Sequence, residues 1–344
     1  MNTLRHNLPV LMLHNINPEW TSEELLETEQ DVATLSTALN ELGHPVEIVP
    51  IEGECLMDRL SIYNPNDYIV FNWCEEIPGV RHSEPRVAAV MEEMGFVFTG
   101  SPYDVLKLAH DKPKIKQILD AANIPTPYWN VFKTPESGQW NIFPSIVKPA
   151  HEHCSIGISP ESIVTCPAEL SNRIEFILET HKQPALVEEF INGREFLNAV
   201  WGNQNISMLP PVEMDYGSLT DIRDRLFTYE AKYVAGSRLY ENIDMRVPAE
   251  LDAQAKFELE QIVIATYKAT GCRDYGRIDV RYYNGVFYVI DVNPNPDINP
   301  QTSMTCAAAE MGYSYGKMGS RIINLAAERH PIFSKKVSMK ESPY

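Results

Sequence analysis

No stretch of the 344-residue sequence approaches eighteen consecutive apolar residues, and its first residues adjoin no long apolar run. We therefore expect neither a transmembrane helix nor a signal peptide. The six cysteines contain no CxxC pair and no dense framework, which favours reduced thiols in a cytoplasmic protein. The net charge is -18 and no cluster of Lys and Arg stands out, so a nucleic-acid surface is not expected. The net charge does not exclude an anionic ligand, because a few lysines can determine the electrostatic potential of a cleft.

The first hundred residues alternate strand and helix signals, which favours a parallel sheet covered by helices. The predicted strands are 8–13, 46–51, 67–72 and 96–99, and the predicted helices are 22–42 and 83–94. Residues 101–123 also predict helix, with Pro113 near the start of a second helix. They end at Ile124-Pro125-Thr126-Pro127, which is typical of a domain boundary.

From Trp129 onward the pattern changes to strands joined by longer loops. Strands are predicted at 143–149, 185–190 and 194–202, and helices at 250–270 and 314–328. Residues 210–237 are rich in Asp, Arg, Tyr and Gly and are long for a loop, which is typical of an active-site lid. The predicted fold class is α/β, with α+β character in the C-terminal half.

A β-hairpin is predicted from Gly276-Arg277-Ile278-Asp279-Val280 and Asp291-Val292-Asn293. Apolar residues alternate on both arms, and Asn284-Gly285 between them is a strong turn signal. A two-residue loop would point Asp279 and Asp291 to opposite faces. A three-residue loop, with Gly285 in the left-handed conformation, would place Arg277, Asp279, Asp291 and Asn293 on one face. We predict the three-residue loop.

This hairpin face is suited to holding Mg2+ on a nucleotide triphosphate. Mg2+ takes hard oxygen ligands and keeps phosphate oxygens and water in the rest of its octahedral shell. Asp279, Asp291 and Asn293 would supply protein oxygens, and Arg277 would meet charge that develops on a phosphoryl or acyl centre. For the hairpin alone, an ordinary polar surface facing water is an equally strong interpretation.

Several other positions could carry chemistry. Lys148 closes an apolar strand, where it could meet a phosphate, although a solvated lysine is the commoner case. The polar turn 151–157 could cover a phosphate with backbone amides. Its histidines, His151 and His153, do not predict a zinc site, because no third ligand is adjacent. Lys232 lies in the predicted lid, from which it could reach phosphates after closure.

Residues 188–191 end one predicted strand, and Glu195 begins the next. Adenine is commonly held by backbone groups in an apolar slot, with a carboxylate available for ribose hydroxyls. The alternative is a charged strand edge that discourages pairing with another chain. None of these positions is specific alone, but their order along the chain is informative.

That order resembles the ATP-grasp superfamily and, within it, the D-alanine–D-alanine ligase family. The stretches that carry the resemblance are Phe98-Thr99-Gly100-Ser101, Asp111-Lys112 with Lys116, Ile124-Pro125-Thr126-Pro127, Ile146-Val147-Lys148-Pro149-Ala150, Val187-Glu188-Glu189-Phe190 with Gly193-Arg194-Glu195-Phe196, Tyr229-Glu230-Ala231-Lys232-Tyr233, Gly276-Arg277-Ile278-Asp279-Val280, and Asp291-Val292-Asn293. The resemblance implies a three-domain ATP-grasp architecture with nucleotide between two antiparallel sheets. It divides the chain into an N-terminal parallel α/β substrate domain (1–104), a central subdomain (105–190) and a C-terminal subdomain (191–344) that carries the metal site and the lid loop 210–237.

The resemblance also implies cofactors and roles. ATP and two Mg2+ ions are expected, with Mn2+ as an alternative metal. Residues expected to bind ATP are Lys112, Lys148 and Lys232 at the phosphates, and Glu188, Glu189, Phe190, Ile191 and Glu195 at adenine and ribose. The expected metal ligands are Asp279, Asp291 and Asn293, and the expected catalytic residues are Arg277, Lys232 and Tyr233. A homodimer is implied by the resemblance alone.

The sequence departs from the family pattern around the two amino-acid pockets. Only Glu24 or Glu27 could replace the glutamate that holds the first substrate's ammonium. Cys154, followed by Ser155, occupies the position of a serine that helps orient substrate.

At the acceptor pocket, Thr302 or Ser303 lies where a serine binds the acceptor's carboxylate. Asp297 adds a carboxylate beside that site, which would repel a carboxylate and attract an ammonium. Substrate selectivity should therefore differ from that of the family's namesake enzymes.

We expect an ATP-dependent carboxylate–amine ligase that forms an amide or dipeptide-like bond through an acylphosphate, on small substrates other than two D-alanines. One alternative is a true D-alanine–D-alanine ligase of peptidoglycan synthesis. The other is a non-catalytic ATP-binding module, although a mere binder needs no oxyanion-stabilising arginine on its metal face. We expect no nucleic-acid partner and no membrane partner.

Overall fold

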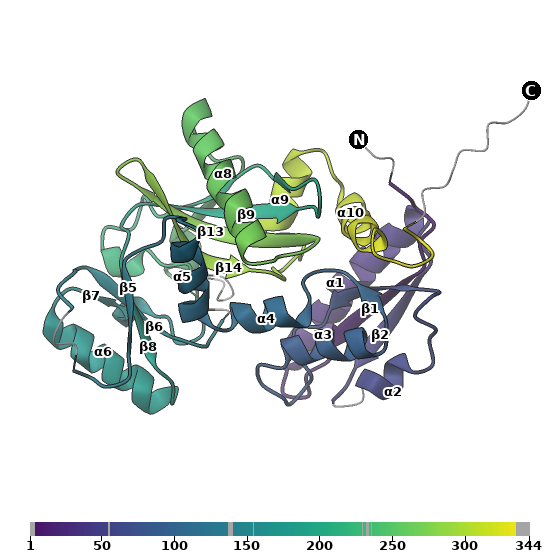
Figure 1. The fold of residues 1–344 in the computed structure, drawn as a ribbon, viewed down its shortest axis with the longest axis horizontal. Coiled ribbons are helices and arrows are strands. Elements are labelled where there is room, and N and C mark those ends of the chain that lie inside the picture. Colours follow the sequence, from purple (N-terminus) through teal and green to yellow (C-terminus); the bar gives the residue numbers. More distant parts are fainter. Residues whose placement is uncertain are drawn as a thin grey trace, which may run out of the picture.

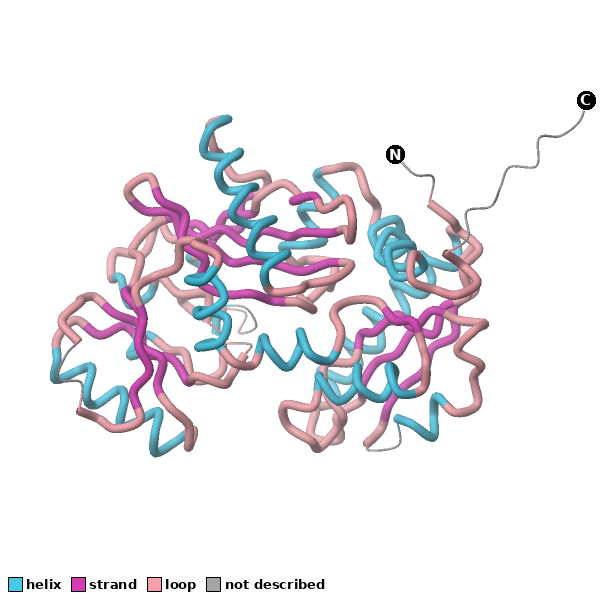
Figure 2. The backbone as a smooth tube through the Cα atoms, viewed as in Figure 1, coloured by secondary structure: helices cyan, strands magenta, loops and turns pink. Residues whose placement is uncertain are grey.

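Three sheets, each with its own helices, organise the protein (Figures 1 and 2). The structure is a computed structural model, and it describes residues 4–53, 56–136, 140–153, 155–228, 230–231, 234 and 236–334. Within those ranges, no helix combines the length and the apolar character that a membrane span requires.

The N-terminal sheet has four parallel strands in the order β2-β1-β3-β4, as the alternating pattern predicts. Its strands are β1 (Val10–Asn15), β2 (Val46–Ile51), β3 (Ile69–Trp73) and β4 (Val97–Phe98), and its helices are α1 (Ser22–Glu41), α2 (Leu56–Leu60) and α3 (Glu84–Glu93). Thr21 and Glu24 form a capping box at the start of α1, and Gly43, with a φ of 102°, follows its end. Two short helices, α4 (Tyr103–Ala109) and α5 (Lys112–Ala121), lead out of this region.

The second sheet is antiparallel, in the order β5-β8-β6-β7. Its strands are β5 (Trp129–Phe132), β6 (Ser145–Pro149), β7 (Ile163–Val164) and β8 (Ala185–Glu189). Helix α6 (Pro167–Thr180) buries Leu170, Ile174 and Ile177 in the core beneath the sheet. This helix has no counterpart among the predicted elements.

The third sheet is also antiparallel, in the order β12-β11-β9-β13-β14, with β10 on β9. Its strands are β9 (Arg194–Trp201), β10 (Ser207–Met208), β11 (Val212–Asp215), β12 (Asp244–Arg246), β13 (Tyr275–Tyr283) and β14 (Val286–Asn293). Helix α8 (Ala253–Ala269) packs on it, and α9 (Ser303–Glu310) and α10 (Tyr315–Ala327) follow. Strand β11 and a short 3-10 helix (Ile222–Asp224) lie inside 210–237, so the predicted lid loop is partly structured.

The C-terminal helix joins the N-terminal sheet to the third sheet. A Cβ on Gly316 would come within 2.8 Å of the Ala38 carbonyl oxygen, and one on Gly319 within 2.9 Å of Leu35, so α10 and α1 pack closely. Leu35 and Met318 belong to one continuous core that also contains residues of β9. The packing of α10 on α1 links the two ends of the chain. The predicted division into domains at residues 104 and 190 stays a prediction.

The β13–β14 hairpin corrects the predicted loop. Tyr283 pairs with Val286, so the loop has two residues, Asn284 and Gly285, with φ angles of 49° and 82°. The prediction of a three-residue loop is wrong. Asp279 nevertheless pairs with Asp291, because the register shifts there and Val280 pairs with Val289. The extra residue on β14, Ile290, forms a β-bulge that returns the carboxylates to one face.

Candidate active site

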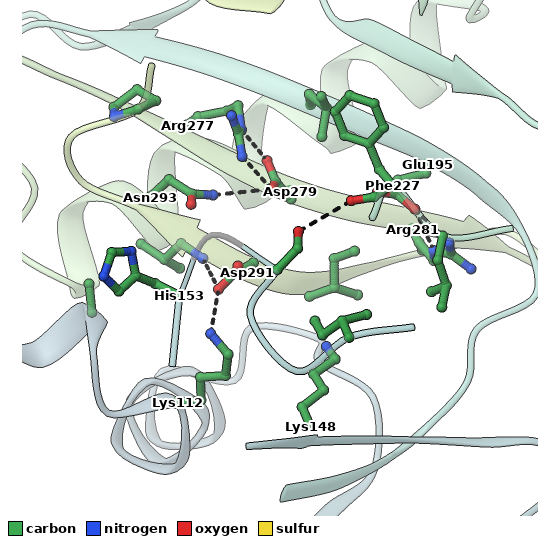
Figure 3. Close-up of a pocket in the computed structure, with 18 of the residues that line it drawn as sticks. Lys112, Lys148, His153, Glu195, Phe227, Arg277, Asp279, Arg281, Asp291 and Asn293 are labelled. Atoms are coloured by element: carbon green, nitrogen blue, oxygen red, sulfur yellow. Dashed lines mark hydrogen bonds and ion pairs between the residues drawn. The ribbon is translucent and has the colours of Figure 1, made fainter. Parts of the chain in front are cut away.

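A single cavity collects most of the predicted site residues (Figure 3). It lies where the second and third sheets face each other, with its far end toward the N-terminal region. The predicted residues that line it are Lys112, Lys148, Ser155, Glu188, Glu189, Phe190, Ile191, Glu195, Arg277, Asp279, Asp291, Asn293 and Asp297. They come from separate sheets, so the fold itself creates the site.

The upper face of the cavity carries a charged cluster from the hairpin. Arg277 donates from Nε to Asp279 Oδ1 at 2.7 Å, and Asn293 Nδ2 donates to Asp279 Oδ2 at 3.1 Å (Figure 3). Burial raises the pKa of Asp279, and Arg277 only partly offsets that effect. A carboxylate held in this way is stabilised further by any cation that approaches it.

Asp291 stands opposite a lysine. Lys112 Nζ lies 3.8 Å from Asp291 Oδ1, and the Asp291 side chain is 40% exposed to the cavity. Burial acts to raise the pKa of Asp291, but Lys112 and Lys148 outweigh it, so the pKa is lowered. Asp291 is therefore ionised and accessible, as a metal ligand must be.

The floor of the cavity contains a buried ion triad. Glu188 lies between Lys148, whose Nζ is 2.6 Å from Oε2, and Lys116, whose ammonium contacts the other carboxylate oxygen. Burial alone would raise the pKa of Glu188, but the two ammonium groups lower it to about 2. Glu188 is therefore paired with two lysines, and its predicted contact with adenine or ribose stays a prediction. Lys116 is a residue that the site prediction missed, although it stands in one of the family-like stretches.

An apolar slot lies beside this floor. Ile146, Phe190 and Leu226 are buried together and line the cavity with Ile191. Glu195 is held through Oε2, which accepts from Arg281 Nε at 2.9 Å and from the Tyr216 hydroxyl at 3.0 Å. Arg281 lies 4.6 Å from the centre of the Phe190 ring. Arg281 therefore contacts both the Glu195 carboxylate and the Phe190 ring, which forms one wall of the slot. The site prediction did not include Arg281.

The lid touches the polar turn across the cavity. Ser155 Oγ donates to the Phe227 carbonyl oxygen at 3.3 Å (Figure 3). Arg225, two residues earlier, donates from NH1 to Asn192 Oδ1 at 3.2 Å. Leu226 and Phe227 therefore line the cavity, and the role of residues 210–237 as a lid stays a prediction. Lys232, Tyr233 and Cys154 lie outside the described residues.

The end of the cavity toward the N-terminal region is acidic. Glu75, Glu84 and Asp297 all line it. Enclosure by the protein and then Asp297, Glu84 and Glu76 raise the pKa of Glu75 to about 7. Asn295 links the walls, because its Nδ2 donates to Glu84 Oε1 at 2.9 Å. Only Asp297 was predicted here; Glu75 and Glu84 come from the N-terminal region, where the family-like signal is weak.

Histidines adjoin this acidic end. His110 and His153 line the cavity, and His82 lies beside them. Burial, followed by the neighbouring His110, lowers the pKa of His153 to about 4. The sequence did not predict a zinc site because no third ligand lies next to His151 and His153 along the chain. The fold brings two histidines from distant positions, His82 and His110, beside His153.

Four predicted substrate residues are not among the cavity-lining residues of the described chain. Glu24 and Glu27 are exposed on α1, and the Glu24 carboxylate accepts the Thr21 amide at 2.7 Å as part of the capping box. Thr302 caps α9, and Ser303 is its buried first residue. The predicted substrate roles of Glu24 and Glu27 gain no support from this placement, and those of Thr302 and Ser303 stay predictions.

Comparison with known proteins identifies the family to which the chain is similar. A family described as D-ala D-ala ligase C-terminus matches residues 119–324. A D-alanine–D-alanine ligase of Carboxydothermus hydrogenoformans is 32% identical over 254 residues, which cover 70% of this chain and 77% of the relative. An uncharacterised protein of Sinorhizobium fredii is 33% identical over 302 residues, covering 85% and 86%.

Solved structures show the same fold. A D-alanine–D-alanine ligase from Bacillus anthracis in complex with ATP has a TM-score of 0.69 and 21% identity, over 93% of this chain and 97% of that one. The VanG D-Ala:D-Ser ligase from Enterococcus faecalis gives the same TM-score and identity, over 93% and 99%. At this identity the likeness concerns the fold alone.

Fold and site together define an ATP-grasp enzyme, a ligase that forms a C–N bond with release of ADP. The chain belongs to the D-alanine–D-alanine ligase family. The predicted family and fold class are confirmed.

Proposed function

We propose that this protein joins a small carboxylate to a cationic amine through an acylphosphate, using ATP and Mg2+. One observation carries the proposal. The hairpin face with Arg277, Asp279, Asp291 and Asn293 looks across one cavity at Lys112 and Lys148, beside an apolar slot. Oxygen donors, two lysines and an apolar slot thus share one cavity, which supports binding of a nucleoside triphosphate.

The nucleotide would lie along the floor and the slot. Ile146, Phe190 and Leu226 offer apolar surface for adenine, while Glu189 and Ile191 offer backbone groups at the connection between β8 and β9. Lys148, which is paired with Glu188, and Lys112, at the start of α5, are proposed to bind the phosphates. Lys232 is proposed as a third phosphate contact from the lid.

The metal would be held by Asp279, Asp291 and Asn293. Two carboxylates and a carboxamide are hard oxygen donors, and they leave room for phosphate oxygens and water. The raised pKa of Asp279 fits this role, because buried negative charge there is unfavourable until a cation offsets it. Bound Mg2+ would polarise the phosphates and neutralise charge during transfer.

The chemistry consists of two displacements. A substrate carboxylate oxygen attacks the γ-phosphorus, the bond to the β-phosphate oxygen breaks, and ADP leaves. The acceptor's ammonium first loses a proton, the free amine nitrogen attacks the acyl carbon and loses a second proton, and phosphate leaves with its bonding electron pair. Arg277, which Asp279 holds through a hydrogen bond, is proposed to stabilise the tetrahedral oxyanion, and Tyr233 and Lys232 are proposed to assist.

The acceptor is proposed to be a cationic amine, because Glu75, Glu84 and Asp297 line the end of the cavity beyond the hairpin. Asp297 would repel an acceptor carboxylate placed beside it. Ser155 and Cys154 are proposed to orient the donor, and Thr302 or Ser303 any acceptor carboxylate. This acidic end favours substrates other than two D-alanines.

A true D-alanine–D-alanine ligase is the second candidate. Curated relatives with that activity, at about 30% identity, favour it. A homodimer, a cytoplasmic location and the absence of nucleic-acid partners remain proposals that rest on the family and on the charge of -18.

The experiment is an ADP-release assay against a panel of carboxylates and amines, with products identified by mass spectrometry. We expect ADP formation that depends on a cationic amine and on Mg2+. Strong selectivity for D-alanine as both substrates would overturn the proposed substrate class, and ADP release independent of every carboxylate would overturn the ligase reaction.

A further inference from the structure

Three histidines from separate parts of the chain meet beside the active-site cavity. His82 lies between β3 and α3, His110 between α4 and α5, and His153 after β6. One nitrogen of each imidazole can be chosen so that all three lie within 4.8 Å of one another. The ring centroids of His110 and His153 are 4.3 Å apart, and His82 lies 6.0 Å and 6.3 Å from them.

The donor set points to a particular kind of ion. Imidazole nitrogen is a preferred ligand of zinc, copper, nickel and cobalt, whereas Mg2+ prefers oxygen. A zinc ion bound tetrahedrally by three imidazoles at about 2.0–2.1 Å holds their nitrogens roughly 3.3 Å apart. The rings must therefore draw together by about 1.5 Å. His82 is exposed and His153 lies in a turn, so rotation of two side chains can close that gap.

Carboxylates stand next to two of the rings. Glu84 Oε2 lies 3.5 Å from His110 Nε2, and Glu152 Oε2 lies 3.7 Å from His82 Nε2. A carboxylate beside a metal-binding imidazole orients the ring, and it can also supply a fourth ligand. A cluster held together only by contacts between its rings would not need acidic groups at the ring nitrogens. The carboxylates of Glu84 and Glu152 therefore favour the binding of a cation by these histidines.

We propose that His82, His110 and His153 bind one divalent transition-metal ion of the zinc type, separate from the Mg2+ site on the hairpin. The ion would tie three segments together: the turn 151–157, the residues before α5, and the loop before α3. His153 is two residues from Ser155, and His110 is two residues from Lys112. The metal would thus fix two cavity walls against the N-terminal region.

Binding is tested on the full chain after removal of metal with a chelator. Co2+ is titrated in the presence of millimolar Mg2+, which occupies oxygen sites, and visible absorption reports nitrogen ligands. We expect one equivalent of Co2+ bound with ligand-field bands, displaced by Zn2+. The His82→Asn variant should lose affinity by roughly a hundredfold.

The matched control is His151→Asn. His151 is exposed on the same turn, and it is not one of the three clustered imidazoles. This variant should bind Co2+ as the natural protein does. Zn2+ should also raise the melting temperature of the natural protein and of His151→Asn by several degrees, but not that of His82→Asn.

The proposal fails if the natural protein binds neither Co2+ nor Zn2+ under these conditions, or if His82→Asn and His151→Asn bind equally. His110→Asn gives an independent measurement, with circular dichroism to verify folding. Because the readout is metal binding, the result does not depend on which substrates the ligase joins.

Discussion

The two ends of the active-site cavity differ in how their charges are arranged. At the end proposed to bind nucleotide, Asp291, Glu188 and Glu195 each lie close to a lysine or arginine. At the end proposed to bind the acceptor, the carboxylates of Glu75, Glu84 and Asp297 lie near one another. A balanced end, in which acidic side chains are paired with basic ones, suits a ligand that carries negative phosphates together with a metal cation. An acidic end favours a positively charged ligand. The family-like residues that line the cavity lie mostly at the balanced end, whereas Asp297, which departs from the family pattern, lies at the acidic end.

The largest expected effect tests the nucleotide end. Asp291→Ala should reduce ADP formation roughly a thousandfold, because loss of a metal ligand removes about 4 kcal/mol of transition-state stabilisation. Its melting temperature should change little, since the side chain is 40% exposed. The measurement pairs steady-state kinetics with a thermal melt. Equal turnover in Asp291→Ala and the natural protein would show that Asp291 is not a metal ligand.

The second prediction concerns the buried triad. Glu188→Ala should lower the free energy of unfolding by about 3–5 kcal/mol, because Lys116 and Lys148 would keep buried charge without a partner. Urea denaturation measures this change. Glu189→Gln, at the next and less buried position, is the control and should cost much less. Similar losses in both variants would contradict the structural role of Glu188.

The third prediction moves to the acceptor end. Asp297→Asn should weaken use of a cationic amine by about tenfold to a hundredfold in kcat/KM, because one charge-assisted contact is worth about 1.5–3 kcal/mol. The KM for ATP should stay unchanged. The Asn299 amide, which donates to Asp297 Oδ1 at 2.9 Å, can still find an oxygen acceptor in the variant. A changed KM for ATP would show that Asp297 also affects ATP binding, so that the two ends of the cavity do not act independently.

The smallest expected effect is a pH dependence. Because enclosure by the protein and then Asp297, Glu84 and Glu76 raise the pKa of Glu75 to about 7, its carboxylate is charged above that pH and protonated below it. The KM for the amine should therefore rise by up to about tenfold as the pH falls from about 8 to about 6. Glu75→Gln should flatten this part of the profile. A profile that is identical in both proteins would exclude Glu75 from amine binding.

Local sequence patterns were sufficient for most elements. Strand 46–51 is predicted and observed with the same bounds, and α1 begins at the predicted Ser22. These elements depend on apolar periodicity and on capping residues within a few positions. Helix α6 escaped prediction although Cys166 and Pro167 mark its start and Leu170, Ile174 and Ile177 recur at helical spacing, so its local signal was present in the sequence.

The hairpin separates what the sequence alone determined from what tertiary structure decided. Asn284-Gly285 indicated a turn, and the residue types Arg277, Asp279, Asp291 and Asn293 predicted a metal-binding face, a role that stays a prediction. The bulge at Ile290 decided that these side chains share that face, because strand register depends on pairing across the sheet as well as on the turn. The meeting of Glu188 with Lys116, and of His82 with His110 and His153, was likewise decided by packing. Contacts between residues tens of positions apart depend on how the sheets are placed, which local periodicity does not encode.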